Sequence, residues 1–598
     1  MSSEKSALLL QAYALLNKAK EVPREELIAL AQQLAKIVLE IGQKQATFKE
    51  RFISRMMAAM MDDPIGKYFT TTLMDRFFRS HRFSTQWQQF SEMKERIGIP
   101  TFLPSIFQVA IESLQTVAHY VPALSTKLLQ SAIRWQTQEV IVDAKTSCLK
   151  AHLKERKKQN IRINLNHLGE AILGEEEAAK RLNIYLKDLK NPLIEYISVK
   201  ISTLYSQINP LAKDQTLSIL QKRLSLLYEA ALENTYTGPG GKKSSKFVNL
   251  DMEEYGDLDL TIELFKQTLD QPAFSKSRAG IVLQSYIPNS WPKLLELIEF
   301  SKKRVQRGAE PIKIRLVKGA NLAMEQWQAR VKGWSQAPYS EKSLVDANFK
   351  RLLQKAMEAC AQNELILGVG SHNLFDICYA LLLRQQLGTG PRVELEMLEG
   401  MAPQIRRAIQ LISSDMLLYC PVANQEEFSS AIAYLVRRLD ENTGTDNFLR
   451  HFFHLDQKPE IFESEAKRFE KSFSLIDSLL VDSFRSPRIL QEEFLASSSL
   501  KKVDEALSLP FKNEPDTDWS CPSTSLFMRQ FLEKQALNDP VTLPCVISGQ
   551  TYLCTQDPSL KIDTAYDLSR PGVKVFDMTL ASWDMVDRAL NTAKASHL

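Results

Sequence analysis

The sequence predicts an α/β protein: a closed (β/α)8 barrel that follows an all-α N-terminal region and precedes a short C-terminal α/β segment. Between about residues 160 and 440, eight short apolar runs alternate with segments of helical period. This alternation indicates parallel strands, because each parallel connection needs a crossover, usually a helix. Eight such units in roughly 280 residues fit a closed barrel. The rival fold, an open doubly wound sheet, lacks support because no G-x-G-x-x-G follows any of the runs.

Composition is that of an ordinary globular protein. The chain has 598 residues, of which 44% are hydrophobic and 24% charged, enough for about three or four domains. A net charge of +4 is small for this length and gives no reason to expect a nucleic-acid partner. The seven cysteines are scattered without metal-ligand spacing, which is typical of reduced thiols in a cytoplasmic protein. No run approaches the roughly 18 apolar residues that span a bilayer, so we expect a soluble protein, at most peripheral on a membrane.

Residues 1–150 are expected to form a helical arm and an α domain. Apolar positions in 24–41 and 104–135 recur at helical spacing, and prolines separate the segments. The first 22 residues carry charges on both sides of a short apolar run. That pattern favours an amphipathic helix over a signal peptide.

The barrel is assigned to residues 155–455. Its predicted strands are 161–165, 196–202, 246–251, 280–286, 312–318, 365–369, 393–397 and 415–419. The helical segments between them include 213–234, 256–270, 290–308, 344–363, 373–387 and 401–412, and a last helix is predicted at 425–441. The glycine-rich stretch 237–245 lacks the spacing of a phosphate-binding loop, so we expect a surface loop there.

The last part of the chain changes character twice. Residues 456–540 combine charge-rich helices with a proline-containing, loop-like stretch at 509–525, and we expect a linker region. Residues 541–598 return to an α/β pattern, with a hairpin predicted over 541–555 and a helix from residue 581. The sequence stops within that helix pattern and shows no capping signal.

The segment 311–320, PIKIRLVKGA, carries the clearest chemical signal. A strand here delivers Arg315 and Lys318 to its C-terminal end, where Gly319 permits a tight turn. Two cations beside small residues suit a phosphate or another anionic ligand. Taken alone, the segment favours an ordinary strand that has a solvated basic edge, and its neighbours change that interpretation.

Polar groups follow nearly every predicted strand, at the end of a barrel where catalytic residues lie. They are Glu170, Lys200, Asp251, Gln284, Arg315, Lys318, Ser371, His372, Asn373, Glu399 and Tyr419. The closing helix adds Tyr434, Arg437 and Arg438. A buried lysine needs a partner, and Lys200, Arg437 and Arg438 are placed to converge on one carboxylate. The arginine pair is also compatible with a solvated helix face, and His372 with either a general base or a cofactor contact.

Several motifs occur in one order: YISVKIS, FVNLDMEEY, VLQSY, IRLVKGA, GSHN and AYLVRRLDENTGTDNFL. Together they resemble the FAD-dependent proline dehydrogenase domain of the bacterial proline utilization A proteins, over residues 160–455. The helical front is similar to the arm and helical domain of that family. Residues 541–598 resemble the opening of the aldehyde dehydrogenase domain that normally follows.

The resemblance implies that L-proline is oxidised to pyrroline-5-carboxylate, with hydride passing to flavin N5 and electrons then to a quinone at the membrane. It places Arg315 near N5, with Gln284 and Asp251 holding the isoalloxazine. The other implied FAD contacts are Lys318, Gly319, Ser371, His372, Asn373 and Glu441. The implied substrate contacts are Lys200, Arg437 and Arg438 at the carboxylate, Leu316, Tyr419 and Tyr434 around the ring, and Glu170 as an ion-pair gate with Arg437. No metal is expected.

The sequence departs from the family pattern at Asn321 and Leu322, where a tyrosine and a tryptophan are common. No ribbon–helix–helix motif precedes the barrel, so DNA binding is not expected. The catalytic cysteine of an aldehyde dehydrogenase would come after residue 598. The chain therefore also fits a fragment of a bifunctional enzyme, with a homo-oligomer or a separate aldehyde dehydrogenase polypeptide as protein partners. Two other classes remain open: an inert barrel serving as a scaffold, and an aldolase-type barrel with Lys200 as Schiff-base nucleophile.

Overall fold

The computed structural model describes residues 3–77, 80, 82–120, 122–137, 140–169, 172–238, 241, 243–424, 431, 434, 447–455, 458–481, 485, 513, 515–536 and 540–596. Four predicted site residues, Glu170, Arg437, Arg438 and Glu441, lie outside these ranges. The chain divides into two compact units, residues 1–517 and 518–598. None of the described helices is both long and apolar enough to cross a bilayer.

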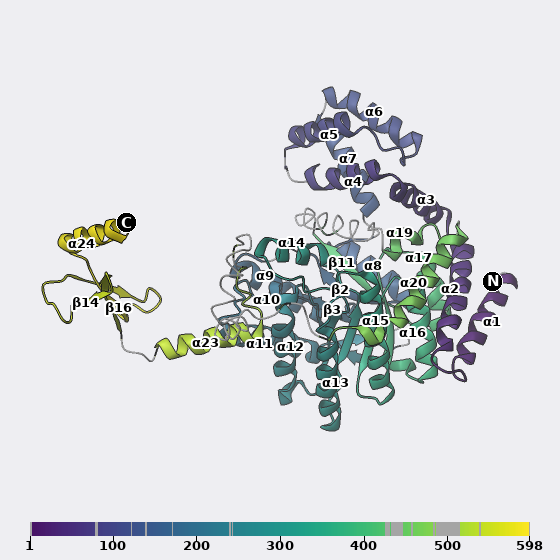
Figure 1. Ribbon diagram of the computed structural model, residues 1–598. Helices are drawn as coiled ribbons and strands as arrows, with labels where there is room; N and C mark the ends of the chain where they lie inside the picture. Colours follow the sequence, from purple (N-terminus) through teal and green to yellow (C-terminus); the bar gives the residue numbers. More distant parts are fainter. Residues whose placement is uncertain are drawn as a thin grey trace. The chain divides into compact units, whose positions relative to one another are not determined.

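Eight parallel strands close into a barrel in the first unit (Figure 1). They are β2 (Arg162–His167), β3 (Tyr196–Val199), β6 (Phe247–Leu250), β7 (Arg278–Gln284), β8 (Lys313–Val317), β9 (Ile366–Gly370), β10 (Val393–Leu398) and β11 (Leu417–Ala423). Pairing of β11 with β2 closes the ring, and the short β1 (Val142–Asp143) adds to β11. The strands are largely buried because helices cover a parallel sheet from outside, and several of them also carry buried polar or charged side chains. The predicted barrel is confirmed, and each predicted strand is present within a few residues.

The helices that connect the strands also follow the predicted pattern. The six predicted segments correspond to α11 (Lys213–Glu233), α12 (Leu258–Leu269), α13 (Ser290–Gln306), α15 (Lys342–Ala361), α16 (Leu374–Gln386) and α17 (Pro403–Ser413). Further helices are α8 (Thr146–Lys158), α9 (Glu175–Lys190), α10 (Ile201–Leu204) and α14 (Leu322–Lys332). Short 3-10 turns are η2 (Tyr255–Asp257), η3 (Pro272–Phe274) and η4 (Gly390–Arg392). The helix predicted at 425–441 falls on residues that are mostly outside the described ones.

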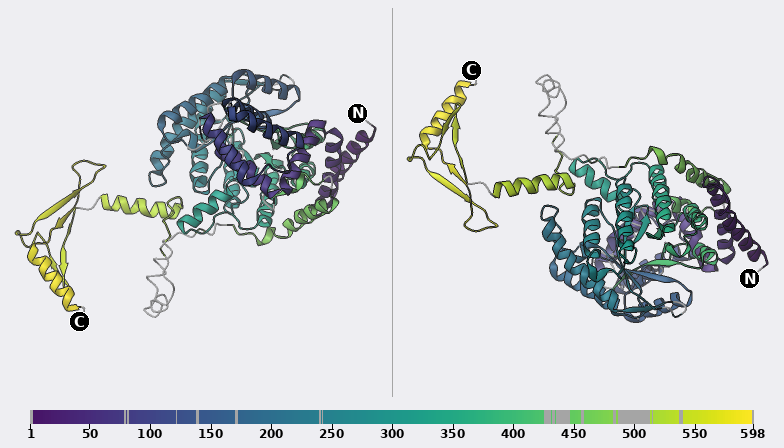
Figure 2. Two further views of the ribbon diagram at one scale, coloured as in Figure 1. Left: turned by 90° about the horizontal axis from the view of Figure 1, so that it is seen from above. Right: turned by 90° about the horizontal axis from the view of Figure 1, so that it is seen from below.

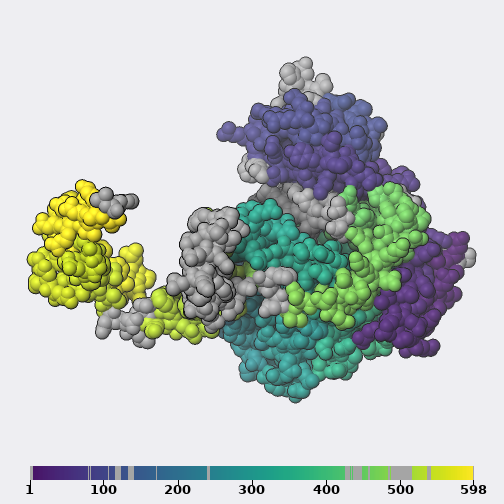
Figure 3. Space-filling model, in the orientation of Figure 1, coloured from purple at the N-terminus to yellow at the C-terminus, as the bar shows by residue number. Residues whose placement is uncertain are grey.

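Helices precede the barrel, as predicted. They are α1 (Ser3–Lys18), α2 (Glu26–Gln45), α3 (Phe48–Asp62), α4 (Pro64–Phe77), α5 (Phe83–Ile97), α6 (Ser105–Tyr120) and α7 (Pro122–Thr137). Helix α2 packs against α16 and α17, and Figures 2 and 3 show the purple N-terminal helices beside the green barrel helices. Helices α4 and α5 share a separate aromatic core that includes Phe69, Trp87 and Phe90.

Two helices after the barrel pack back onto it. They are α19 (Phe448–Phe452) and α20 (Pro459–Ser474), followed by η5 (Ile476–Ser478). The ring of Phe469 on α20 stacks on Phe375 of α16, with centroids 5.7 Å apart. Burial of such large apolar side chains stabilises this contact by about 1.5–3 kcal/mol each.

The second unit is small and mixed. It contains α23 (Pro522–Ala536), β12 (Val541–Leu543), β13 (Cys545–Ile547), β14 (Gln550–Tyr552), β15 (Ile562–Tyr566), β16 (Lys574–Thr579) and α24 (Trp583–Ser596). Strands β13 and β14 form a hairpin whose turn residues Ser548 and Gly549 both have positive φ, as a two-residue turn requires. The predicted hairpin is thus shorter than expected, because β12 pairs in parallel with β16 instead.

Two loop predictions were wrong in part. Both ends of the stretch 237–245 belong to an antiparallel pair, β4 (Thr235–Thr237) with β5 (Lys243–Ser245), although the sequence pattern of these residues is weak. The stretch 509–525 enters helix α23 at Pro522, a residue that suits the first turn of a helix.

Candidate functional site

The predicted site residues that the structure describes gather at the C-terminal ends of the barrel strands. Lys200 follows β3, Asp251 follows β6 and Gln284 ends β7, while Arg315 lies in β8 and Tyr419 in β11. Parallel strands in a closed barrel bring these ends to one rim. The residues are therefore distant in sequence and close in space.

Arg315 is held from three sides. Its Nε lies 2.7 Å from Glu396 Oε2, and its Nη1 lies 3.6 Å from Asp251 Oδ1. Its guanidinium carbon lies 4.3 Å from the centre of the Tyr419 ring, within range of a cation–π interaction. Burial lowers the pKa of Arg315, but the carboxylates of Glu396 and Asp251 outweigh it and raise that pKa. The side chain is a permanently charged, oriented cation.

Tyr419 and Asp251 complete this arrangement. The Tyr419 hydroxyl donates to Asp251 Oδ2 over 2.7 Å, and Asn249 Nδ2 donates to Asp251 Oδ1 over 2.9 Å. Burial first, and then the charge of Asp251, raise the pKa of Tyr419, so the hydroxyl keeps its proton. The Asp251 carboxylate is thereby fixed between a cation and two neutral donors.

Below Arg315, alternating charges continue through the barrel interior. Lys313 Nζ lies 2.5 Å from both Glu394 Oε2 and Glu396 Oε1, and Glu394 is also ion-paired with Arg162. Gly368 makes room for this network, since a Cβ there would lie 2.1 Å from Glu396 Oε1. Sequence reasoning missed Glu394 and Glu396 because it considered only strand ends. Their alternation in the run VELEM was the available signal.

Lys200 approaches the same region from β3. Its Nζ lies 2.5 Å from Glu253 Oε1, and the Ser202 hydroxyl donates to the same carboxylate. Glu253 and Asp251 belong to one loop after β6, so this loop contacts both Lys200 and Arg315. Glu253 lies in the sequence motif FVNLDMEEY, but the motif alone does not reveal its contact with Lys200.

Gln284 offers a buried hydrogen-bond acceptor of the kind that a cofactor contact needs. Its Nε2 donates to the Met252 carbonyl over 3.0 Å. Its Oε1 is buried and accepts no hydrogen bond among the described residues. An unsatisfied buried acceptor costs about 1–3 kcal/mol, so a donor from a bound group, such as a flavin ring N–H, is expected there.

Lys318 and Gly319 follow β8 directly. Lys318 Nζ lies 2.5 Å from Asp346 Oδ1 and 2.6 Å from Asp376 Oδ2. Gly319 has a φ of 130°, and a Cβ there would lie 2.5 Å from Tyr286 Cγ. Only glycine fits this turn, which places Lys318 at the rim.

The segment 371–373 directly precedes helix α16, and Asn373 is the N-cap of that helix. The Asn373 side chain accepts from the backbone N–H groups of Phe375 and Asp376 over 3.0 and 3.2 Å, and Ser371 Oγ accepts from the Asn373 N–H. His372 Nε2 accepts from the Leu398 N–H over 2.9 Å, so the neutral ring carries its proton on Nδ1. This engagement of Nε2 disfavours a general-base role and suits positioning at a helix start.

The apolar residues of the predicted site are buried. Leu316 is part of the main core, and Tyr434 packs with Ile141, Leu168 and Ala423 at the ends of β2 and β11. Tyr434 therefore lies at the same rim as Tyr419. The arginine pair on the same predicted helix lies outside the described residues.

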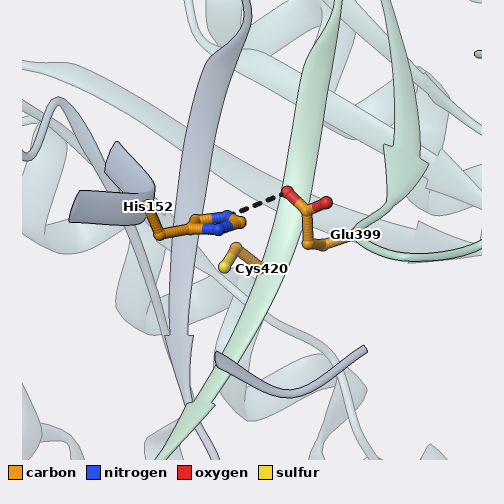
Figure 4. Close-up of side chains that lie close together, drawn as sticks. All are labelled: His152, Glu399 and Cys420. Carbon is orange, nitrogen blue, oxygen red and sulfur yellow. Dashed lines mark hydrogen bonds and ion pairs between the residues drawn. The ribbon is translucent and has the colours of Figure 1, made fainter. Parts of the chain in front are cut away.

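Glu399, a predicted strand-end residue, is used elsewhere. It contacts His152 at 3.1 Å and Arg156 at 3.0 and 2.5 Å, both on α8, and Cys420 lies nearby (Figure 4). Imidazole, thiol and carboxylate groups are common metal ligands, but here Arg156 already neutralises the Glu399 carboxylate. Burial first, and then Glu399, raise the pKa of Cys420, which keeps the thiol protonated. The group is a structural link between α8 and the barrel.

Comparisons with known proteins identify the family of this chain. The sequence pattern of the family described as Proline dehydrogenase matches residues 149–451, just over half of the chain. A structure of Proline Utilization A (PutA) from Corynebacterium freiburgense is 34% identical, with a TM-score of 0.55, and the match covers 72% of this chain and 39% of that chain. No curated protein matches the chain.

More distant structures share the fold. PutA from Bdellovibrio bacteriovorus inactivated by N-propargylglycine is 23% identical, with a TM-score of 0.73, covering 95% of this chain and 54% of that chain. A mutant PutA from Bradyrhizobium japonicum is 16% identical, with a TM-score of 0.57, covering 90% and 53%. The chain thus spans about half, or less, of the length of these structures. The match over the barrel and the 34% identity show that the chain belongs to the proline dehydrogenase family, whose members are FAD-dependent enzymes.

Proposed function

We propose that this chain oxidises L-proline to pyrroline-5-carboxylate with FAD as its cofactor and a quinone as the final electron acceptor. The observation that carries the proposal is the Arg315 guanidinium fixed by Glu396, Asp251 and Tyr419 at the barrel rim of a proline dehydrogenase family member. A preorganised cation of this kind stabilises negative charge that develops beside it.

Different residues of the barrel rim would contact different parts of FAD. FAD, when bound, supplies the hydride acceptor that no protein side chain provides. Arg315, Asp251 and Gln284 would hold the ring system, with Gln284 Oε1 accepting from a ring N–H. Lys318 would meet the phosphates, and the remaining contacts would come from Gly319, Ser371, His372, Asn373 and Glu441.

The substrate would lie between cations and an apolar wall. Lys200, Arg437 and Arg438 would bind the proline carboxylate, since paired cations favour an anion held in one orientation. Leu316, Tyr419 and Tyr434 would enclose the ring, and Glu170 would close the site through Arg437. Such fixing of the reacting carbon against the cofactor is the protein's main contribution to the rate.

A Schiff-base mechanism at Lys200 is the competing chemistry. Lys200 is ion-paired with Glu253 at 2.5 Å, and an ion-paired ammonium has no lone pair for attack. This contact supports a binding role for Lys200. Borohydride trapping of a carbonyl substrate on Lys200 would contradict it.

The proposed quinone acceptor indicates where in the cell the protein acts. A quinone dissolved in a bilayer requires at least transient contact with a membrane surface, so we place the protein in the cytoplasm with peripheral contact at the inner face. The seven cysteines, which are all free, are consistent with that compartment.

The test is an assay with L-proline and a soluble quinone, in which pyrroline-5-carboxylate is trapped and measured. Product formation that requires both L-proline and FAD is the expected result. Absence of product with FAD-saturated protein would refute the proposed reaction.

A further inference from the structure

Three lysines and two aspartates form one charged cluster just beyond the C-terminal end of β8. Lys318 contacts both Asp346 and Asp376, at 2.5 and 2.6 Å. Lys342 contacts Asp346 at 2.6 Å, and Lys350 contacts Asp376 at 2.7 Å. Three cations against two carboxylates leave one positive charge uncompensated within the cluster.

The uncompensated charge lies on the open side of the cluster. Lys350 and Asp376 are enclosed, with side chains 2% and 0% exposed, and Lys350 Nζ also lies 4.8 Å from the Phe469 ring centre. Lys318 and Lys342 are 19% and 32% exposed. Both of their ammonium groups contact the same oxygen, Asp346 Oδ1. One carboxylate oxygen thus serves two cations at the accessible edge.

We propose that Lys342 is a second phosphate-binding lysine of the rim, and that Lys318 and Lys342 together hold a phosphate group of the bound FAD. The inference rests on the proposed function and adds a residue that it does not use. Two ammonium groups sharing one oxygen can each offer further N–H donors to an anion, since each carries three. A phosphate between them would supply the negative charge that the cluster lacks.

The arrangement also predicts that phosphate binding is linked to a proton. Partial burial first, and then the neighbouring Lys318, lower the pKa of Lys342 to about 8. The charged groups that act on it are Lys318 after β8, Asp346 on α15 and Asp376 on α16. A bound phosphate favours the charged ammonium and raises that pKa, so binding takes up a proton above about pH 8. FAD affinity should be constant below that pH and fall by up to about tenfold per pH unit above it.

Equilibrium dialysis of the purified flavoprotein, with retained flavin measured from about pH 6.5 to about pH 9.5, tests this linkage. Lys342→Met should bind FAD about tenfold more weakly near pH 7 and lose the pH dependence. Lys342→Arg should bind tightly across the range, because arginine stays charged. Lys355→Met is the matched control on the same helix, where the lysine forms an exposed pair with Glu358 at 3.8 Å. It should behave as the unmodified chain.

Riboflavin has no phosphate, so its binding distinguishes the loss of a phosphate contact from a general structural change in the flavin site. Its affinity should be the same in the unmodified chain and in Lys342→Met. Equal losses for riboflavin and FAD, or an Lys342→Met variant with unchanged FAD affinity and pH slope, would overturn the assignment of Lys342. A chain that retains no flavin at any pH would overturn the proposed function itself, whereas a flavoprotein bleached by L-proline with pH-independent FAD affinity would overturn only this inference.

Discussion

The guanidinium carbon of Arg315 lies 4.3 Å from the centre of the Tyr419 ring, although 104 positions separate the two residues. Asp251 joins them, since it contacts Arg315 Nη1 at 3.6 Å and accepts from the Tyr419 hydroxyl at 2.7 Å. Strands β8 and β11 and the loop after β6 therefore contribute to one rigid polar unit. A unit of this kind can hold a charge in place without the reorganisation that a solvated arginine would need.

Replacing the cation should affect catalysis more than folding. Arg315→Met is expected to lower kcat/KM for L-proline by about 100-fold or more, the usual effect of removing one charge-stabilising donor. Glu396 keeps Lys313 as a partner, so the variant should still fold. Steady-state kinetics and circular dichroism check both points. Arg392→Met, at a half-buried arginine hydrogen-bonded to Asn363, is the control and should retain full activity.

Removing the charge of Glu396 should affect stability. Its carboxylate is fully buried between Lys313 and Arg315, at 2.5 and 2.7 Å. Glu396→Gln is expected to lower the free energy of unfolding by about 3–5 kcal/mol, because breaking a buried network leaves its cations under-compensated. Urea denaturation measures this loss. In Glu299→Gln, which breaks an exposed pair with Lys303, the change should stay below about 1 kcal/mol, and equal losses in the two variants would contradict the role of the interior network.

The turn after β8 should not tolerate a side chain. In Gly319→Ala the new methyl group would meet Tyr286 at 2.5 Å in a backbone conformation with φ of 130°. Strain of this kind costs about 1–3 kcal/mol and should displace Lys318, so both the Tm and FAD retention are expected to fall. Gly390→Ala, at a glycine with open space and no positive φ, should leave both unchanged. A normal Tm and normal FAD retention in Gly319→Ala would show that the turn is not constrained.

Asp257 should make stability depend on pH. Burial first, and then Glu254, Glu253 and Glu325, raise the pKa of Asp257 to about 7. The folded-state pKa exceeds the ordinary value, so the stability linked to the protonated form is present below about pH 4 and is lost as pH rises through about 7. Asp257→Asn should therefore raise the Tm near pH 8 and flatten its decline between about pH 5 and about pH 8.

Thermal unfolding across that pH range measures the effect. Asp270→Asn, at an exposed aspartate paired with Arg307, serves as the control and should keep the slope of the unmodified chain. The same slope in Asp257→Asn as in the unmodified chain would exclude Asp257 as its cause.

The sequence was sufficient to predict the barrel because its signal is local. Each strand is a short apolar run followed by a helical segment, and a closed parallel barrel requires nothing else from the pattern. Arg315, Lys318 and Tyr419 could be placed at the rim by the same logic, since they lie at or near the end of a strand. The structure gives the positions of the described site residues, whereas the binding and catalytic roles of all the predicted site residues stay predictions.

The features of the fold and the site that the sequence did not predict depend on contacts between residues distant in the chain. Glu396 and Glu394 lie inside the barrel rather than at its rim, and alternation in one strand does not tell the inner face from the outer. Lys342 reaches the rim from a helix start, where a lysine usually faces solvent. Strand β12 pairs with β16, more than thirty residues away, rather than joining the hairpin next to it in sequence. No local pattern specifies these contacts.

The most direct test of the central claim, that the rim around Arg315 holds a flavin next to L-proline, is a visible absorption spectrum of the purified protein before and after anaerobic addition of L-proline. The account predicts a flavin spectrum that is bleached by L-proline in the unmodified chain and bleached far more slowly in Arg315→Met. A protein that stays colourless with added FAD, or a bound flavin that L-proline leaves oxidised, would contradict it.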